Sequence, residues 1–123
     1  ASMPLFAPLP EDARLGRLCQ AFLKSPQIHL GPQVWADQLH LSLRSFTRKF
    51  RQQTGLSFGQ WRQQACLLNA VSRLSAGASV TQIALDLGYD SPSAFSTMFR
   101  KCLGQAPRNF SRPLGETGYR PAA

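Results

Sequence analysis

The sequence predicts an all-α fold in which two helix-turn-helix units are joined by a long connecting helix, with about seven helices in total. Three observations predict it. Apolar residues recur at the three- and four-residue spacing of amphipathic helices. Serines, glycines and prolines stand where helices should begin and end. A pattern in residues 42–55 returns in residues 91–104, and no stretch shows the sustained alternation of a strand.

The first predicted helix follows from the apolar spacing of Leu15, Leu18 and Phe22. Asp12 would lie in its first turn, where negative charge is favourable, and Pro26 would end it.

Two further helices form the first predicted helix-turn-helix unit, residues 33–54. Pro32 suits the first turn of the short one, which runs to about Leu39. Ser42 caps the longer one over residues 43–54, and Gly55 closes it.

The connecting helix is predicted over residues 58–75. Ser57 with Gln60 forms a capping box before it, and Gly77 follows its end.

The second helix-turn-helix unit is predicted over residues 80–103, followed by a short turn at 107–110. Its boundary signals are Ser79 with Gln82, Gly88, Ser91 with Pro92, and Gly104. Around the domain of residues 11–112, the proline-rich residues 1–10 predict a linker whose first three residues resemble a cloning scar. Residues 113–123 predict a flexible tail.

The second helix of each unit is strongly two-sided at 100° per residue. The apolar side of the first holds Leu43, Phe46 and Phe50, and the opposite side holds Arg44, Arg48 and Arg51. The apolar side of the second holds Pro92, Phe95, Phe99 and Cys102, and the opposite side holds Ser93, Thr97 and Arg100. One face would anchor each helix to the core, and the other would be free to enter a major groove.

The charge distribution points to a polyanionic partner. Fourteen Lys and Arg against six Asp and Glu give a net charge of +8. Residues 42–112 hold ten bases and only Asp86 and Asp90, so the whole excess lies there. Such an excess favours nucleic acid first and an anionic membrane second as the partner, and the helix faces suited to a major groove indicate double-stranded DNA.

Other protein classes lack the residues they need. No phosphate loop, nucleophile motif or metal-ligand spacing is present, so we expect no enzyme, cofactor or metal. No apolar run approaches the roughly 18 residues of a membrane span. The three dispersed cysteines favour reduced thiols in a cytoplasmic protein. Two alternatives stay open, namely a non-specific architectural DNA-binding protein and a basic module that docks an acidic protein.

Two blocks carry a resemblance to a known family. They run from Phe50-Arg51 to Trp61 and from Val80 to Phe95, and Asn109-Phe110 resembles the closing motif. Residues 11–112 resemble the C-terminal DNA-binding domain of the AraC/XylS family of bacterial transcription regulators. The resemblance implies seven helices and recognition of two adjacent major-groove segments. The groove positions that it implies are Arg44, Ser45, Thr47 and Arg48 in the first unit, and Ser93, Ala94, Ser96 and Thr97 in the second.

The helix positions and the family together suggest further contacts and partners. Arg51 and Arg100 lie further along their helices and are expected to bind phosphate, and Gln60, Arg62 and Lys101 are further phosphate candidates. The family also implies contacts with RNA polymerase and a separate effector-binding or dimerisation domain. His40 stands where the family often has Gly, so we expect it in a left-handed conformation.

Overall fold

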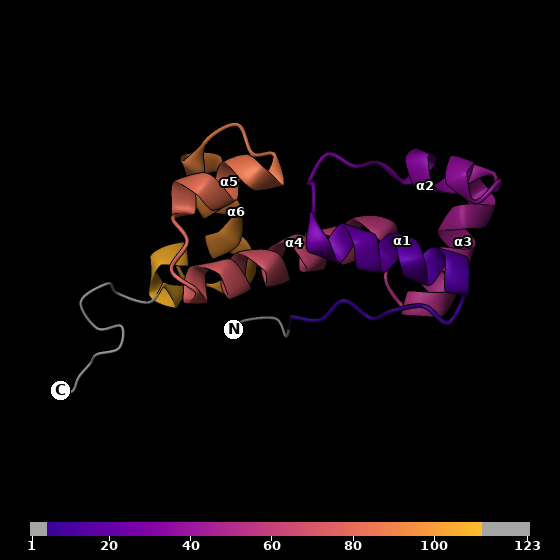
Figure 1. The fold of residues 1–123 in the computed structure, drawn as a ribbon, viewed down its shortest axis with the longest axis horizontal. Helices are drawn as coiled ribbons and strands as arrows, with labels where there is room; N and C mark the ends of the chain where they lie inside the picture. Colours follow the sequence, from indigo (N-terminus) through magenta and orange to yellow (C-terminus); the bar gives the residue numbers. More distant parts are fainter. Residues whose placement is uncertain (1–4, 112–123) are drawn as a thin grey trace. The chain divides into compact units, whose positions relative to one another are not determined.

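The computed structural model describes residues 5–111, and every regular element in that range is a helix (Figure 1). Within residues 5–111, six α-helices and one 3-10 helix agree with the predicted all-α class and with the prediction of about seven helices. The chain divides into two compact units, a first unit of Leu5–Cys66 and a second unit that begins at Leu67. The predicted cloning scar and the predicted tail lie outside the described residues.

The first unit contains α1 (Ala13–Lys24), α2 (Pro32–Gln38), α3 (Leu43–Thr54) and the first part of α4 (Phe58–Ser75) (Figure 1). The predicted bounds of the second, third and connecting helices agree with these to about one residue. Local capping and helix-breaking signals therefore suffice to place the helices.

Asp12 has a different role from the one that the sequence predicted. It precedes the first turn of α1 as its N-cap, and its carboxylate accepts a hydrogen bond from the Leu15 N–H at 2.9 Å. The sequence placed Asp12 inside the first turn, but the helix begins one residue later, at Ala13. A carboxylate is favourable both at the N-cap and in the first turn, so its charge did not distinguish the two positions.

An aromatic cluster forms the core of the first unit. Its central residue is Trp35 of α2, which is 3% exposed. Trp35 contacts other rings at centroid distances of 5.1–6.4 Å, mostly edge to face. These rings belong to Phe22, Phe46, Phe50, Phe58 and Trp61. Edge-to-face geometry suits the quadrupoles of aromatic rings, so the cluster joins α1, α2, α3 and α4 in one core.

Residues 5–10 form no helix, but two hydrogen bonds attach them to α4. The Trp61 Nε1–H donates to the Pro8 carbonyl at 2.9 Å, and the Phe6 N–H donates to Gln64 Oε1 at 3.3 Å. Both acceptor and donor on α4 are buried, so these bonds satisfy groups that would otherwise be costly to bury.

The second unit combines the rest of α4 with α5 (Val80–Leu87), α6 (Pro92–Leu103) and the 3-10 helix η1 (Pro107–Phe110) (Figure 1). Its core is built on two fully buried phenylalanines of α6. The rings in contact are Phe95 with Tyr89 and Phe99, and Phe99 with Phe110. The predicted turn at 107–110 is thus confirmed as η1, and it helps to cover the core.

Serine hydroxyls cap the helices as predicted. Ser42, Ser57, Ser79 and Ser91 each accept a hydrogen bond from the N–H three residues later, at 3.0–3.1 Å. The Ser57 box is reciprocal, because the Ser57 N–H donates to Gln60 Oε1.

The second predicted capping box is only half formed. Ser79 Oγ accepts the Gln82 N–H as expected. The Gln82 side chain, however, donates to Asp86 Oδ1 at 2.7 Å, one turn further along α5. The reciprocal bond was predicted from spacing alone, and a carboxylate at i+4 is the stronger acceptor.

The tight turns of the two units use different residues for one left-handed position. Gly88 has φ of 100° in the second unit, and His40 has φ of 58° in the first. This confirms the expected conformation of His40. A non-glycine residue in this region carries a cost of about 1 kcal/mol or more.

The predicted apolar faces of α3 and α6 need correction at their ends. Phe46, Phe50, Phe95 and Phe99 are fully buried as predicted. Leu43 and Pro92 are exposed, and Cys102 is half-buried. Leu43 and Pro92 begin their helices, so no preceding turn covers them. Leu103 of α6 and Thr54 of α3 are buried near the helix ends instead.

In each unit an aspartate has a lowered pKa and belongs to an ion pair. In the first, Lys49 Nζ lies 3.0 Å from Asp12, and the Asp12 pKa is lowered chiefly by the Leu15 N–H bond and then by Lys49. In the second, an Arg73 nitrogen lies 2.7 Å from Asp86, and the Asp86 pKa is lowered first by Arg73.

Substitution of His40 tests the strained turn. We expect His40→Val to lower the free energy of unfolding of the first unit by about 1–2 kcal/mol, because a β-branched residue suits this conformation poorly. His40→Gly should match or exceed the wild type. Urea unfolding followed by tryptophan fluorescence reports on this unit, since both tryptophans lie in it. Equal stability of the two variants would contradict this account of the turn.

The two lowered pKa values predict acid sensitivity. Stability from Asp12 and Asp86 is fully present above the ordinary aspartate pKa of about 4 and is lost as pH falls through the lowered folded-state values. Melting temperatures measured by circular dichroism should therefore drop in this acid range. The double variant Asp12→Asn, Asp86→Asn should drop less, and a profile as steep as that of the wild type would refute the assignment.

Candidate nucleic-acid interface

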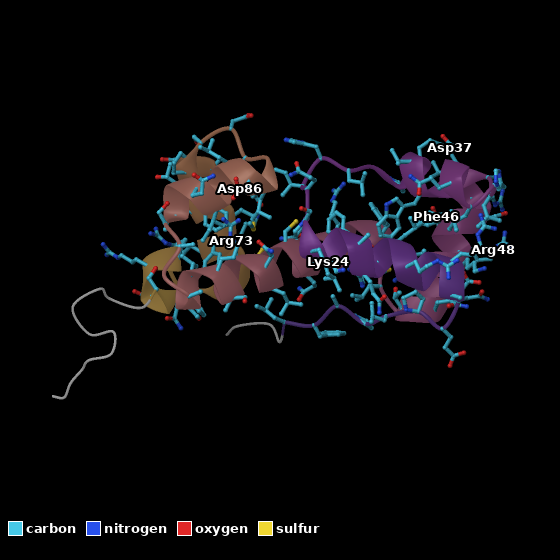
Figure 2. The ribbon with its side chains drawn as sticks, viewed as in Figure 1. Lys24, Asp37, Phe46, Arg48, Arg73 and Asp86 are labelled. Carbon is cyan, nitrogen blue, oxygen red and sulfur yellow. The ribbon has the colours of Figure 1, made fainter. Side chains whose placement is uncertain are left out.

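The exposed side of α3 is a row of arginines. Arg44, Arg48 and Arg51 are all exposed. The side chain of none of them forms a hydrogen bond or an ion pair with another residue between 5 and 111. Figure 2 shows Phe46 toward the interior of the first unit and Arg48 at its outer edge. The row is therefore free to meet a partner.

Neighbouring acids do not neutralise this row. Asp12 is occupied by Lys49, which lies on the flank of α3 away from the arginines. Asp37 accepts a hydrogen bond from Gln33 within α2 at 2.8 Å. Guanidinium groups stay charged at any ordinary pH and offer a planar fork of donors. The face can thus bind phosphate or the acceptor edge of a base.

Other groove positions implied by the resemblance differ in exposure. Thr47 of α3 is exposed. On α6 the groove positions Ser93, Ala94 and Thr97 are exposed, and so is the phosphate candidate Arg100. Ser45 and Ser96 are half-buried, so they present less surface to a partner.

The three additional phosphate candidates are placed very differently. Lys101 of α6 is exposed. Gln60 is exposed, but its side-chain oxygen already caps Ser57. Arg62 is half-buried, donates to the Leu30 carbonyl at 2.6 Å and lies over the Phe58 ring at 5.8 Å. Arg62 therefore has a structural role within the first unit.

Sequence reasoning missed Leu43 as a member of the exposed face. It is 42% exposed at the first position of α3, beside Arg44. Its angular position bordered the core face and suggested burial. The signal that could have found it is its place in the first turn, which lacks a covering turn.

The buried thiols do not contribute to this surface. Cys19 and Cys66 are buried, and burial raises the pKa of each thiol to about 12. Residues 5–111 contain no cluster of three metal-ligating side chains. In the same range no helix is long and apolar enough to cross a membrane.

Comparison with known proteins identifies the family. A family model described as "Helix-turn-helix domain" matches residues 35–113. The chain is 38% identical to the HTH-type transcriptional regulator NimR of Escherichia coli K12, over 86% of this chain and 39% of NimR. It is also 38% identical to the transcriptional activator RhaS of E. coli O157:H7, over 68% of this chain and 30% of RhaS. The chain thus spans well under half the length of these relatives.

Solved structures agree with the sequence matches. The C-terminal domain of AraT, a response regulator from Geobacillus stearothermophilus, superposes with a TM-score of 0.72 at 27% identity, over 85% of this chain and 90% of that one. The DNA-binding domain of AdpA, solved in complex with a target DNA, gives a TM-score of 0.70 at 28% identity, over 80% and 90%. The chain therefore belongs to the AraC/XylS-type helix-turn-helix family of transcription regulators.

Proposed function

We propose that this chain is the sequence-specific DNA-binding domain of a bacterial transcription regulator. The helices α3 and α6 act as recognition helices that enter two adjacent major-groove segments of double-stranded DNA. The domain acts by binding DNA, and it does so in the bacterial cytoplasm, where the chromosome lies.

One observation carries this proposal. Arg44, Arg48 and Arg51 form an exposed row opposite the buried Phe46 and Phe50, and no described residue forms a hydrogen bond or ion pair with their side chains. A helix held by one face and charged on the other fits the width of the major groove. The crystal structure of the related AdpA domain with its target DNA supports the same use of the fold.

The two recognition helices contribute unequally. Arg44 and Arg48 lie in the first two turns of α3, where base edges are within reach, and a guanidinium can bridge O6 and N7 of guanine. The corresponding part of α6 offers Ser93 and Thr97, whose hydroxyls discriminate less. We assign base reading mainly to α3. Arg51 and Arg100 would bind phosphate, together with Lys101.

The whole regulator would contain more than this domain. The curated relatives NimR and RhaS are more than twice as long as the region that matches this chain. We propose a further domain for effector binding or dimerisation, and a contact with RNA polymerase.

Truncation of the arginines tests the assignment of base reading. On a duplex selected from a random pool, Arg44→Ala or Arg48→Ala should cost about 1–3 kcal/mol of binding free energy. Ser93→Ala and Thr97→Ala should cost clearly less. Fluorescence anisotropy titration at fixed salt measures all four. Arg17→Ala is a matched control, because Arg17 is exposed on α1 and its loss removes the same charge.

Two outcomes would contradict this proposal. Equal losses at all four positions would refute the unequal division between α3 and α6. A ratio of specific to non-specific affinity near one would refute sequence-specific binding, since such ratios are typically at least about 10³. That result would favour a non-specific architectural protein.

Salt dependence tests the phosphate contacts. Affinity should fall steeply with salt, and Arg51→Gln or Arg100→Gln should each reduce the slope of log K against log salt by about 0.9. Both variants should weaken specific and random duplexes to a similar degree, because phosphate contacts carry no sequence information. A slope unchanged in both variants would show that neither side chain neutralises a phosphate.

A further inference from the structure

The exposed face of α3 is apolar along one edge. Leu43 is 42% exposed at the first position of the helix, although it adjoins the buried Phe46 and Phe50 on the helical wheel. Burial within the fold would have removed an apolar side chain of this size from water. The fold instead leaves it beside Arg44, on the part of a recognition helix that approaches base edges.

Thr47 extends this edge by one turn. It follows Leu43 at i+4 and is exposed, so the two side chains are neighbours on the helix surface. At 100° per residue Thr47 lies about 40° from Leu43, and Arg44 lies about 60° beyond Thr47. The Leu43 side chain and the Thr47 methyl group thus form an apolar edge, which we call the methyl edge.

The second recognition helix does not repeat this edge. The positions that correspond to Leu43 and Thr47 are Pro92 and Ser96. Ser96 is half-buried and has no methyl group. Of the two recognition helices, only α3 has the methyl edge. This edge is apolar, whereas the arginine row is charged.

One group in the major groove matches an apolar edge. The C5-methyl of thymine projects into this groove and is contacted by apolar side chains, whereas phosphates offer no apolar surface. We propose that Leu43 and Thr47 recognise a thymine methyl next to the guanine that Arg44 or Arg48 binds. This inference rests on the proposed function, and it specifies the DNA site that α3 reads as thymine beside guanine.

Removal of the methyl group from the DNA tests the inference directly. The duplex selected with this chain from a random pool is resynthesised with each thymine replaced in turn by 2′-deoxyuridine, which differs only by that methyl. Binding of the wild type, Leu43→Ala and Thr47→Ser is measured by anisotropy. Leu43→Ala keeps a good helix former at an exposed position, and Thr47→Ser keeps the hydroxyl.

Leu85→Ala provides a matched control. Leu85 is a leucine of similar exposure, 55%, but it lies on α5 outside both recognition helices. Circular dichroism melts of all variants check that each is folded.

We expect at least one thymine whose replacement weakens wild-type binding about fourfold, as for one buried methylene. That penalty should disappear in Leu43→Ala, decrease in Thr47→Ser and persist in Leu85→Ala. The same thymine should neighbour a base at which Arg44→Ala or Arg48→Ala relaxes selectivity.

Failure of this inference can be told apart from failure of the proposed function. If selection yields no preferred duplex, the proposed function and this inference both fail. If a preferred duplex exists but no deoxyuridine weakens wild-type binding, or if Leu43→Ala keeps the full penalty, the methyl edge reads no thymine. The proposed function would then stand without it.

Discussion

The packing of Trp35 against Phe46 and Phe50 is the constraint on which the first unit depends. A 12-residue helix such as α3 is marginal by itself in water, so tertiary packing must stabilise it. The aromatic cluster provides that packing and selects which face of α3 is buried. The opposite face is exposed as a direct consequence. The residues of α3 that pack in the core therefore determine which of its residues are exposed to a partner.

The second unit uses the same principle with a different surface. Phe95 and Phe99 hold α6, and the rings of Tyr89 and Phe110 cover them. The free face of α6 is mostly hydroxyl-bearing and small, with Arg100 and Lys101 toward its end. The two helices are anchored in the same way but expose different side chains, which is why we propose that α3 does most of the base reading.

The ion pairs distinguish cations that are held within the fold from cations that are available to DNA. Lys49 and Arg73 are each held by an aspartate of their own unit. The pKa of Asp12 is lowered first by the Leu15 N–H bond and then by Lys49, and that of Asp86 is lowered first by Arg73. Such pairs remove cations from the set that can meet DNA. The net charge of +8 explains attraction to a polyanion. We propose that position on α3, beside an apolar edge, is what gives an arginine a role in base discrimination.

The sequence by itself determined the helices, most of their caps and the buried phenylalanines, because these depend on residues within a few positions of one another. Ser42, Gly55 and the left-handed His40 are examples. Only the tertiary structure decided that Arg62 binds the Leu30 carbonyl, that residues 5–10 are fastened to α4, and that Leu43 stays exposed. These features depend on groups far apart in the chain, or on the absence of a covering neighbour, and neither leaves a periodic signal. The candidate DNA-binding face was therefore predictable as a row of arginines, whereas the apolar spacing placed Leu43 in the core and only the folded structure showed it exposed.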